Sequence, residues 1–217
     1  MSNDTENRPD VDQNDDSVSY AYENGYDFLA LDSVRAEVCK CLRYGLNQAA
    51  LTLTNHLLES ALKKFLILVY TKEKESTECD IRNVFDEGTE LYADKNLDTT
   101  INKACTIGLI DKKEKKILHG FRVKYRNGFS HADPTKIFSS SPLPARLVKL
   151  KGDETPEEML NQLYGVPNVE FNPQTAIFLQ GLLQKLTADA HAENYFLSVD
   201  EIIRNIIKRM RDKLRGK

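Results

Sequence analysis

Apolar residues recur through most of this chain at intervals of three and four, the spacing that places them on one face of an α-helix. Capping residues stand at several of the expected helix starts, among them Asp32, Asp98 and Asp111, and Gly45 and Gly108 mark two of the expected turns. In the helix after Asp111, the predicted inward stripe consists of Ile117, Leu118, Phe121 and Tyr125. In its first half the chain is therefore predicted to form helices over residues 33–46, 48–71, 80–95 and 98–105, and from 111 into the segment around 126.

The helix predicted over 48–71 carries the largest apolar surface, because leucine, alanine, phenylalanine and valine occupy most of its circumference. A helix of this kind is buried in its own domain or covered by a partner. His56 and Glu59 are its polar exceptions, three residues apart on one face. We interpret them as a buried pair or as a contact to the candidate site described below, because a metal site needs further ligands that the sequence does not indicate.

The last quarter of the chain predicts two more helices. The first opens at Asn172-Pro173 and extends to about 192, with Phe178, Leu179, Leu182, Leu183 and Leu186 facing inward. Ser198 and Glu201 have the spacing of a capping box, which predicts the start of a second helix there. The preceding stretch is rich in proline, serine and glycine, and predicts a short strand over 146–150 and a short helix over 155–164.

These elements predict an all-α fold, a helical bundle of four to five core helices with a C-terminal helical extension. The acidic and polar first residues predict a disordered tail. The predicted organisation is an acidic tail over 1–18, the helical bundle over 19–135, an irregular connection with a short helix over 136–172, and two C-terminal helices that pack on the bundle over 173–217.

Composition favours a soluble domain with a real core, since 41% of the residues are hydrophobic and 29% are charged. A net charge of −3 gives no general attraction to nucleic acid, so any such binding depends on a local basic surface. The four cysteines contain no CxxC pair, and we expect reduced thiols and a cytoplasmic location. We predict no signal peptide, membrane span, metal site or cofactor.

The candidate chemistry lies in Arg126, Asn127 and His131, which stand within six consecutive positions. Arginine offers a planar, permanently charged set of donors that suits a phosphodiester oxygen, and histidine exchanges a proton near neutral pH. At about 100° per residue, Asn127 and His131 fall roughly 40° apart on a helix, whereas Arg126 and His131 are about 140° apart. Two copies that face each other across a two-fold axis would bring both side chains into one cleft.

A structural role for the same segment stays open, because Arg126-Asn127-Gly128 is also a plausible helix end with the glycine in a left-handed conformation. The basic residues that precede the segment have two interpretations as well. They are a solvated helix face, or they attract a polyanion such as RNA. These candidate RNA-binding residues are Lys112, Lys113, Lys115, Lys116, Arg122 and Lys124.

The sequence Arg126-Asn127-Gly-Phe-Ser-His131 resembles the signature of the HEPN superfamily, all-helical domains found in RNA-cleaving toxins and in defence nucleases. The resemblance covers roughly residues 30–135. It implies a metal-independent endoribonuclease, of the toxin–antitoxin or antiviral defence kind, that acts as a homodimer. It also implies that Arg126, Asn127 and His131 are the catalytic residues.

Two other functions are weighed beside this one. In the first, the chain is a non-catalytic helical module that binds RNA, a nucleotide or a partner protein through the same surface. In the second, it is an antitoxin-like or regulatory subunit that docks through its basic C-terminal helix and its Pro/Ser-rich stretch. RNA, a second copy and such a subunit are the expected partners, and no membrane is expected.

Overall fold

The computed structural model describes residues 24–74, 80–127, 129, 143–145, 169–171 and 180–215. Within this part the order of the elements is α2 (Leu29–Arg43), α3 (Asn47–Lys74), α4 (Ile81–Tyr92), α5 (Leu97–Thr106), α6 (Lys112–Phe121), the π-helix η1 (Arg122–Asn127), β1 (Leu143–Ala145), β2 (Val169–Phe171) and α9 (Gln180–Arg215). The predicted all-α bundle is confirmed. The two strands have three residues each and pair antiparallel with one another.

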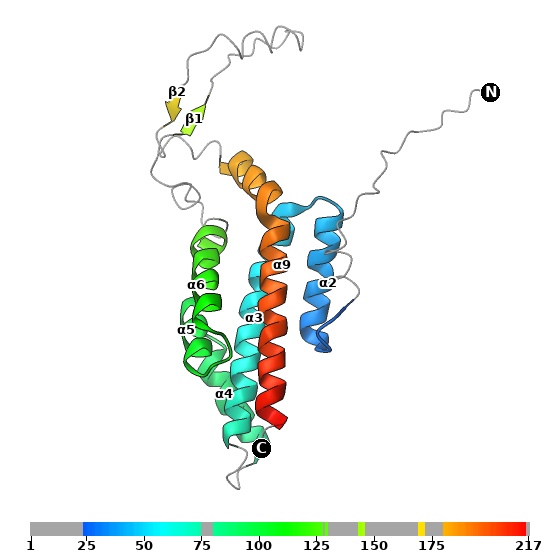
Figure 1. Cartoon of the computed structure of the whole chain (residues 1–217), viewed down its shortest axis with the longest axis vertical. Helices are drawn as coiled ribbons and strands as arrows, with labels where there is room; N and C mark the ends of the chain where they lie inside the picture. The colour runs from blue at the N-terminus through cyan, green and yellow to red at the C-terminus, as the bar shows by residue number, and fades with distance from the viewer. Residues whose placement is uncertain are drawn as a thin grey trace, which may run out of the picture.

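The bundle is organised around α3, which lies between α2, α4 and α9 (Figure 1). The apolar residues that the sequence places around most of this helix are buried inside the chain itself. The fully buried ones are Ala50, Leu51, Leu57, Leu58, Ala61, Leu62 and Phe65. The apolar surface of α3 is therefore satisfied by its own bundle, and it gives no reason to expect a second copy.

Glycines end two of the predicted helices as expected. Gly45 has a φ of +67° and separates α2 from α3. Gly108 has a φ of +71°, and its N–H donates to the carbonyl of Cys105 while that of Leu109 donates to Ala104. Glycine adopts this left-handed conformation without the strain that a Cβ brings, so both turns are a local consequence of the sequence.

One predicted helix start is wrong by four residues, and a second predicted helix has a different capping residue. Helix α2 begins at Leu29 instead of residue 33, and the Asp32 carboxylate accepts hydrogen bonds from the N–H groups of Tyr26 and Phe28 upstream of it. Helix α5 is capped by Asn96, whose side chain accepts from the N–H of Thr99. The carboxylate first assigned to that cap, Asp98, is used by side chains of α6 and η1.

The predicted break before residue 198 is also wrong, because α9 is one helix of 36 residues. The Ser198 hydroxyl donates to the carbonyl of Asn194 in the preceding turn, a bond that satisfies serine inside a helix. The apolar stripe continues through this point without a change of phase, over Ala188, Ala192, Tyr195, Phe196, Val199, Ile202, Ile203 and Ile206. Leu186, predicted to face inward, is 55% exposed.

Some predictions fall outside the described part. These are the tail over 1–18, the strand over 146–150 and the short helix over 155–164. Among the described residues, no helix combines the length and the apolar character that a membrane crossing needs.

A buried polar cluster ties α9 to the start of the described chain. Asp200 accepts from the Arg35 Nε at 2.8 Å and from the Tyr26 hydroxyl at 2.5 Å, and its second oxygen accepts from the Arg204 Nε at 2.8 Å. The side chains of Arg35 and Asp200 are only 3% and 7% exposed. Burial of the phenol, and next the charge of Asp200, raise the pKa of Tyr26 far above its usual range. The cluster therefore joins three segments: the residues around Tyr26, helix α2 and helix α9.

Replacing Asp200 by alanine should destabilise the protein by about 3–5 kcal/mol, because it leaves the buried Arg35 charge without its partner. Urea unfolding followed by circular dichroism measures this difference. The control is Glu201→Ala, which changes the exposed neighbour and should cost less than about 0.5 kcal/mol. If Asp200→Ala lowers the free energy of unfolding by less than about 1 kcal/mol, the cluster does not hold these segments together.

Candidate functional site

The helix that leads to the candidate motif begins with a complete capping box. The Asp111 carboxylate accepts from the N–H of Glu114 at 2.8 Å, and the Glu114 carboxylate accepts from the N–H of Asp111 at 2.8 Å. Glu114 also receives two guanidinium bonds from Arg209 of α9, at 2.6 and 3.1 Å. The predicted cap at Asp111 is confirmed, and α9 fixes this end of α6.

The first two residues of the motif, Arg126 and Asn127, are not on a regular α-helix. After Phe121 the backbone continues as a π-helix over Arg122–Asn127. Such segments are rare and occur often at functional sites, because their i→i+5 hydrogen bonds re-aim side chains. The angles predicted for Asn127 and His131 assume α-helical geometry, which the segment does not keep through Asn127. The side chain of Asn127, and His131 as a whole, lie outside the described residues.

Three aromatic rings fix the position of η1 against α9. Phe121 and Tyr125 both pack on Tyr195, with ring centroids 4.8 and 4.7 Å apart. The Tyr195 hydroxyl in turn donates to the Asn55 side chain of α3 at 2.8 Å. Tyr125 is 5% exposed, so it is the buried anchor of the motif segment. Ile117, predicted to share this inward stripe, is instead 45% exposed.

Arg126 lies next to this anchor and is oriented by α3. Its Nη2 is 3.7 Å from an oxygen of Glu59, and its side chain is 34% exposed. The other Glu59 oxygen pairs with Lys63 at 3.0 Å. A separation of 3.7 Å is an ion pair but too long for a hydrogen bond. No side chain in the described part of the chain takes a hydrogen bond from this guanidinium, and its donors suit an oxyanion. Of the predicted pair on α3, Glu59 contacts the motif, whereas His56 is exposed.

All six candidate RNA-binding residues are at least partly open to solvent. Lys112, Lys113, Lys116 and Lys124 are exposed, and Lys115 is half-buried. Arg122 differs from them because its guanidinium pairs with Asp98 of α5 at 2.9 Å. The Arg122 charge is therefore paired between η1 and α5, and its contact with RNA stays a prediction. The basic surface consists of the five lysines.

His119 of α6 belongs to no candidate catalytic or metal-binding pattern in the sequence. In the structure it contacts Asp98 of α5, the residue that also pairs with Arg122. Its Nδ1 is 3.4 Å from Asp98, and its Nε2 is 3.4 Å from the Asn102 side-chain oxygen. Asn102 also donates to Asp98 at 3.2 Å. Both ring nitrogens are thus engaged, and the cluster joins the two helices.

His191 of α9 is a functional candidate that the sequence did not indicate. Its Nε2 is 3.3 Å from the ammonium of Lys124, and its ring centroid is 6.0 Å from that of Tyr125. Burial, followed by the charge of Lys124, lowers the pKa of His191 below its usual value. The neutral ring accepts a hydrogen bond from the ammonium of Lys124. Only the packing of α9 on η1 could reveal this, because the two residues are far apart in the chain.

The described residues contain no group of three or more side chains suited to hold a metal ion. Comparison of the chain with protein-family models, curated proteins and solved structures finds no match. The function is therefore argued from the residues of this chain.

The titration of His191 tests the geometry around the motif. Its folded pKa lies below the unfolded value of about 6.5, so the unfolded chain binds more protons and stability falls as the pH drops below that value. Proton NMR should give a pKa for His191 below 6.5, and Lys124→Gln should raise it. A pKa that Lys124→Gln leaves unchanged would mean that the two side chains are not in contact in solution.

Proposed function

We propose that this protein is a metal-independent endoribonuclease of the kind that the HEPN-like motif implies. The observation that supports this most directly is Arg126, a partly exposed guanidinium that Glu59 orients beside a basic surface. A fixed arginine with unused donors binds the non-bridging oxygens of a phosphodiester. It also stabilises the extra charge that builds on them during cleavage.

The proposed reaction uses the RNA itself as the nucleophile. The 2′-hydroxyl attacks the adjacent phosphorus while the bond from phosphorus to the 5′-oxygen breaks, which leaves a 2′,3′-cyclic phosphate and a 5′-hydroxyl. In this proposal His131 moves the proton, as base for the 2′-hydroxyl or acid for the leaving oxygen. Arg126 binds the phosphate and Asn127 orients the pair. DNA lacks the nucleophile and is not cleaved.

The proposal includes a homodimer in which two copies of the motif face each other. Its support is local: Ile117 and Val123, on the helix and π-helix that carry the motif, are 45% and 54% exposed. Apolar side chains beside a catalytic segment suit contact with a second copy. Light scattering that gives a monomer at micromolar concentration would overturn this part of the proposal.

His131→Ala should reduce cleavage of single-stranded RNA in EDTA by about 100- to 10,000-fold, because it removes the proton transfer. Arg126→Ala should cost about 100- to 1,000-fold, and Arg126→Lys should not restore activity, because a point charge lacks the planar fork. The assay measures the cyclic-phosphate product, with circular dichroism to show that each variant is folded. Cleavage at the wild-type rate by a folded His131→Ala protein would exclude the ribonuclease and leave the binding module.

Alanine at Lys112, Lys113 and Lys116 should act on binding instead of on the chemical step. Each lost phosphate contact lowers the slope of log K against log salt by about 0.7 for single-stranded RNA. Fluorescence anisotropy at several salt concentrations measures the slope, and single-turnover rates at saturating protein should stay near wild type. Arg122→Ala is the contrasting variant: it breaks the pair with Asp98 and should lower stability more than the salt slope. Equal slopes in the triple variant and the wild type would show that this face does not contact RNA.

A further inference from the structure

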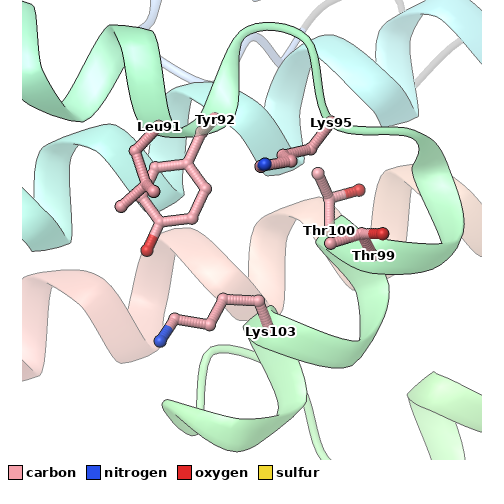
Figure 2. Close-up of a pocket in the computed structure, with 6 residues that line it drawn as sticks. All are labelled: Leu91, Tyr92, Lys95, Thr99, Thr100 and Lys103. Carbon is pink, nitrogen blue, oxygen red and sulfur yellow. The ribbon is translucent and has the colours of Figure 1, made fainter.

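A pocket of about 220 Å³ lies between α4 and the first turn of α5, away from the motif segment. Leu91 and Tyr92 form one side, and Thr99 and Thr100 lie opposite (Figure 2). Lys95 and Lys103 complete the lining, and both side chains extend from the threonine side toward Tyr92. Its accessible wall is mostly carbon, so the pocket combines an apolar floor with two cations.

Three polar side chains of this pocket, Tyr92, Lys95 and Lys103, have no hydrogen bond or ion pair within the described residues, whereas the Thr100 hydroxyl donates to the carbonyl of Leu97. Tyr92 is 7% exposed, and its hydroxyl has no hydrogen-bond partner among the described residues. Burial of the ring, with the nearby charge of Glu73, raises the pKa of Tyr92, so the group is a neutral donor at pH 7. Lys95 and Lys103 are exposed, and within the described part of the chain neither forms an ion pair. The Tyr92 hydroxyl itself is reached by solvent, so it and the two ammonium groups are accessible to a ligand.

The size and charge of the pocket define the ligand. Pockets for drug-sized ligands measure about 300–1,000 Å³, so this one takes a smaller molecule with a single ring or a short apolar group. Two lysines suit a dianion better than a single carboxylate, and the positive end of the α5 dipole adds to their attraction. The phenol of Tyr92 supplies a directed hydrogen bond to an anionic oxygen.

We propose that this pocket binds a compact organic phosphate monoester, with its apolar group against Leu91 and Tyr92 and its phosphate between Lys95 and Lys103. This site does not depend on RNA cleavage, because none of its residues belongs to the motif segment. At the binding energy per atom that is typical of drug-sized ligands, a ligand of about ten non-hydrogen atoms has a Kd of roughly 5 mM, which sets the range of the test.

Phenyl phosphate is the probe, and phenol and inorganic phosphate are its two halves. Amide chemical shifts of Thr99, Thr100 and Lys103 are followed by NMR as each compound is added to the full chain. Phenyl phosphate should bind at least about 5-fold more tightly than either half, because only the whole molecule uses both the apolar floor and the cations. No shifts at concentrations on the order of 10 mM, or equal binding of inorganic phosphate, would overturn the proposal.

Variants then assign the contacts. The double variant Lys95→Ala, Lys103→Ala should lower the affinity for phenyl phosphate at least about 10-fold, because both cations are removed. Tyr92→Phe should lower this affinity about 3-fold, because a hydrogen bond to a charged group is lost. Lys40→Ala removes an exposed charge from α2, which does not line the pocket, and should leave binding unchanged. Tyr92→Phe keeps the ring, so the fold is retained. Unchanged affinity in the double lysine variant would place the probe elsewhere and refute the site.

Discussion

The structure depends on the burial of α3. A helix with leucine and phenylalanine on most of its circumference cannot be covered by one neighbour, so α2, α4 and α9 surround it. Burial of each large apolar side chain contributes about 1.5–3 kcal/mol, and the fully buried residues of α3 therefore dominate the stability of the bundle. Helix α9 has to be long because it covers α3 over most of its length (Figure 1).

Charged residues then decide how the outer helices attach to this core. Asp200 binds the start of the described chain through Arg35 and Tyr26, and Arg209 binds the capping box of α6 through Glu114. Both acceptors are almost fully buried, so each pair is directional as well as costly to break. One face of α9 thereby supplies apolar contacts to α3, while its edges hold α2 and α6 in place.

The candidate site is a consequence of the same arrangement. Tyr125 packs against α9 through Tyr195, and Arg126 reaches Glu59 on α3. The two residues are neighbours in sequence but differ in role: Tyr125 is buried and anchors the π-helix, whereas the charge of Arg126 is partly exposed to solvent. The packing of Tyr125 and the ion pair of Arg126 with Glu59 therefore fix the segment against two different helices of the bundle.

Much of the fold was determined by sequence patterns that act locally. Helix existence, the turns at Gly45 and Gly108, and the Asp111 cap follow from periodicity, left-handed glycine and capping chemistry, and the structure confirms them. The sequence also predicted that α3 is covered, but it left open whether its own bundle or a partner covers it. The motif at Arg126, Asn127 and His131, together with its flanking lysines, could be selected from the sequence alone.

Only the tertiary structure decided which polar residues work together. The capping pattern at Ser198 looked like a helix start, but continuous burial against α3 outweighed that local preference and kept α9 in one piece. Arg122 could not be distinguished from the lysines beside it until α5 placed Asp98 within 2.9 Å. Likewise, His191 gained its partner Lys124 only when α9 packed on η1. Local sequence determines which helices form, whereas pairing between distant charges depends on packing across the bundle, which no short pattern contains.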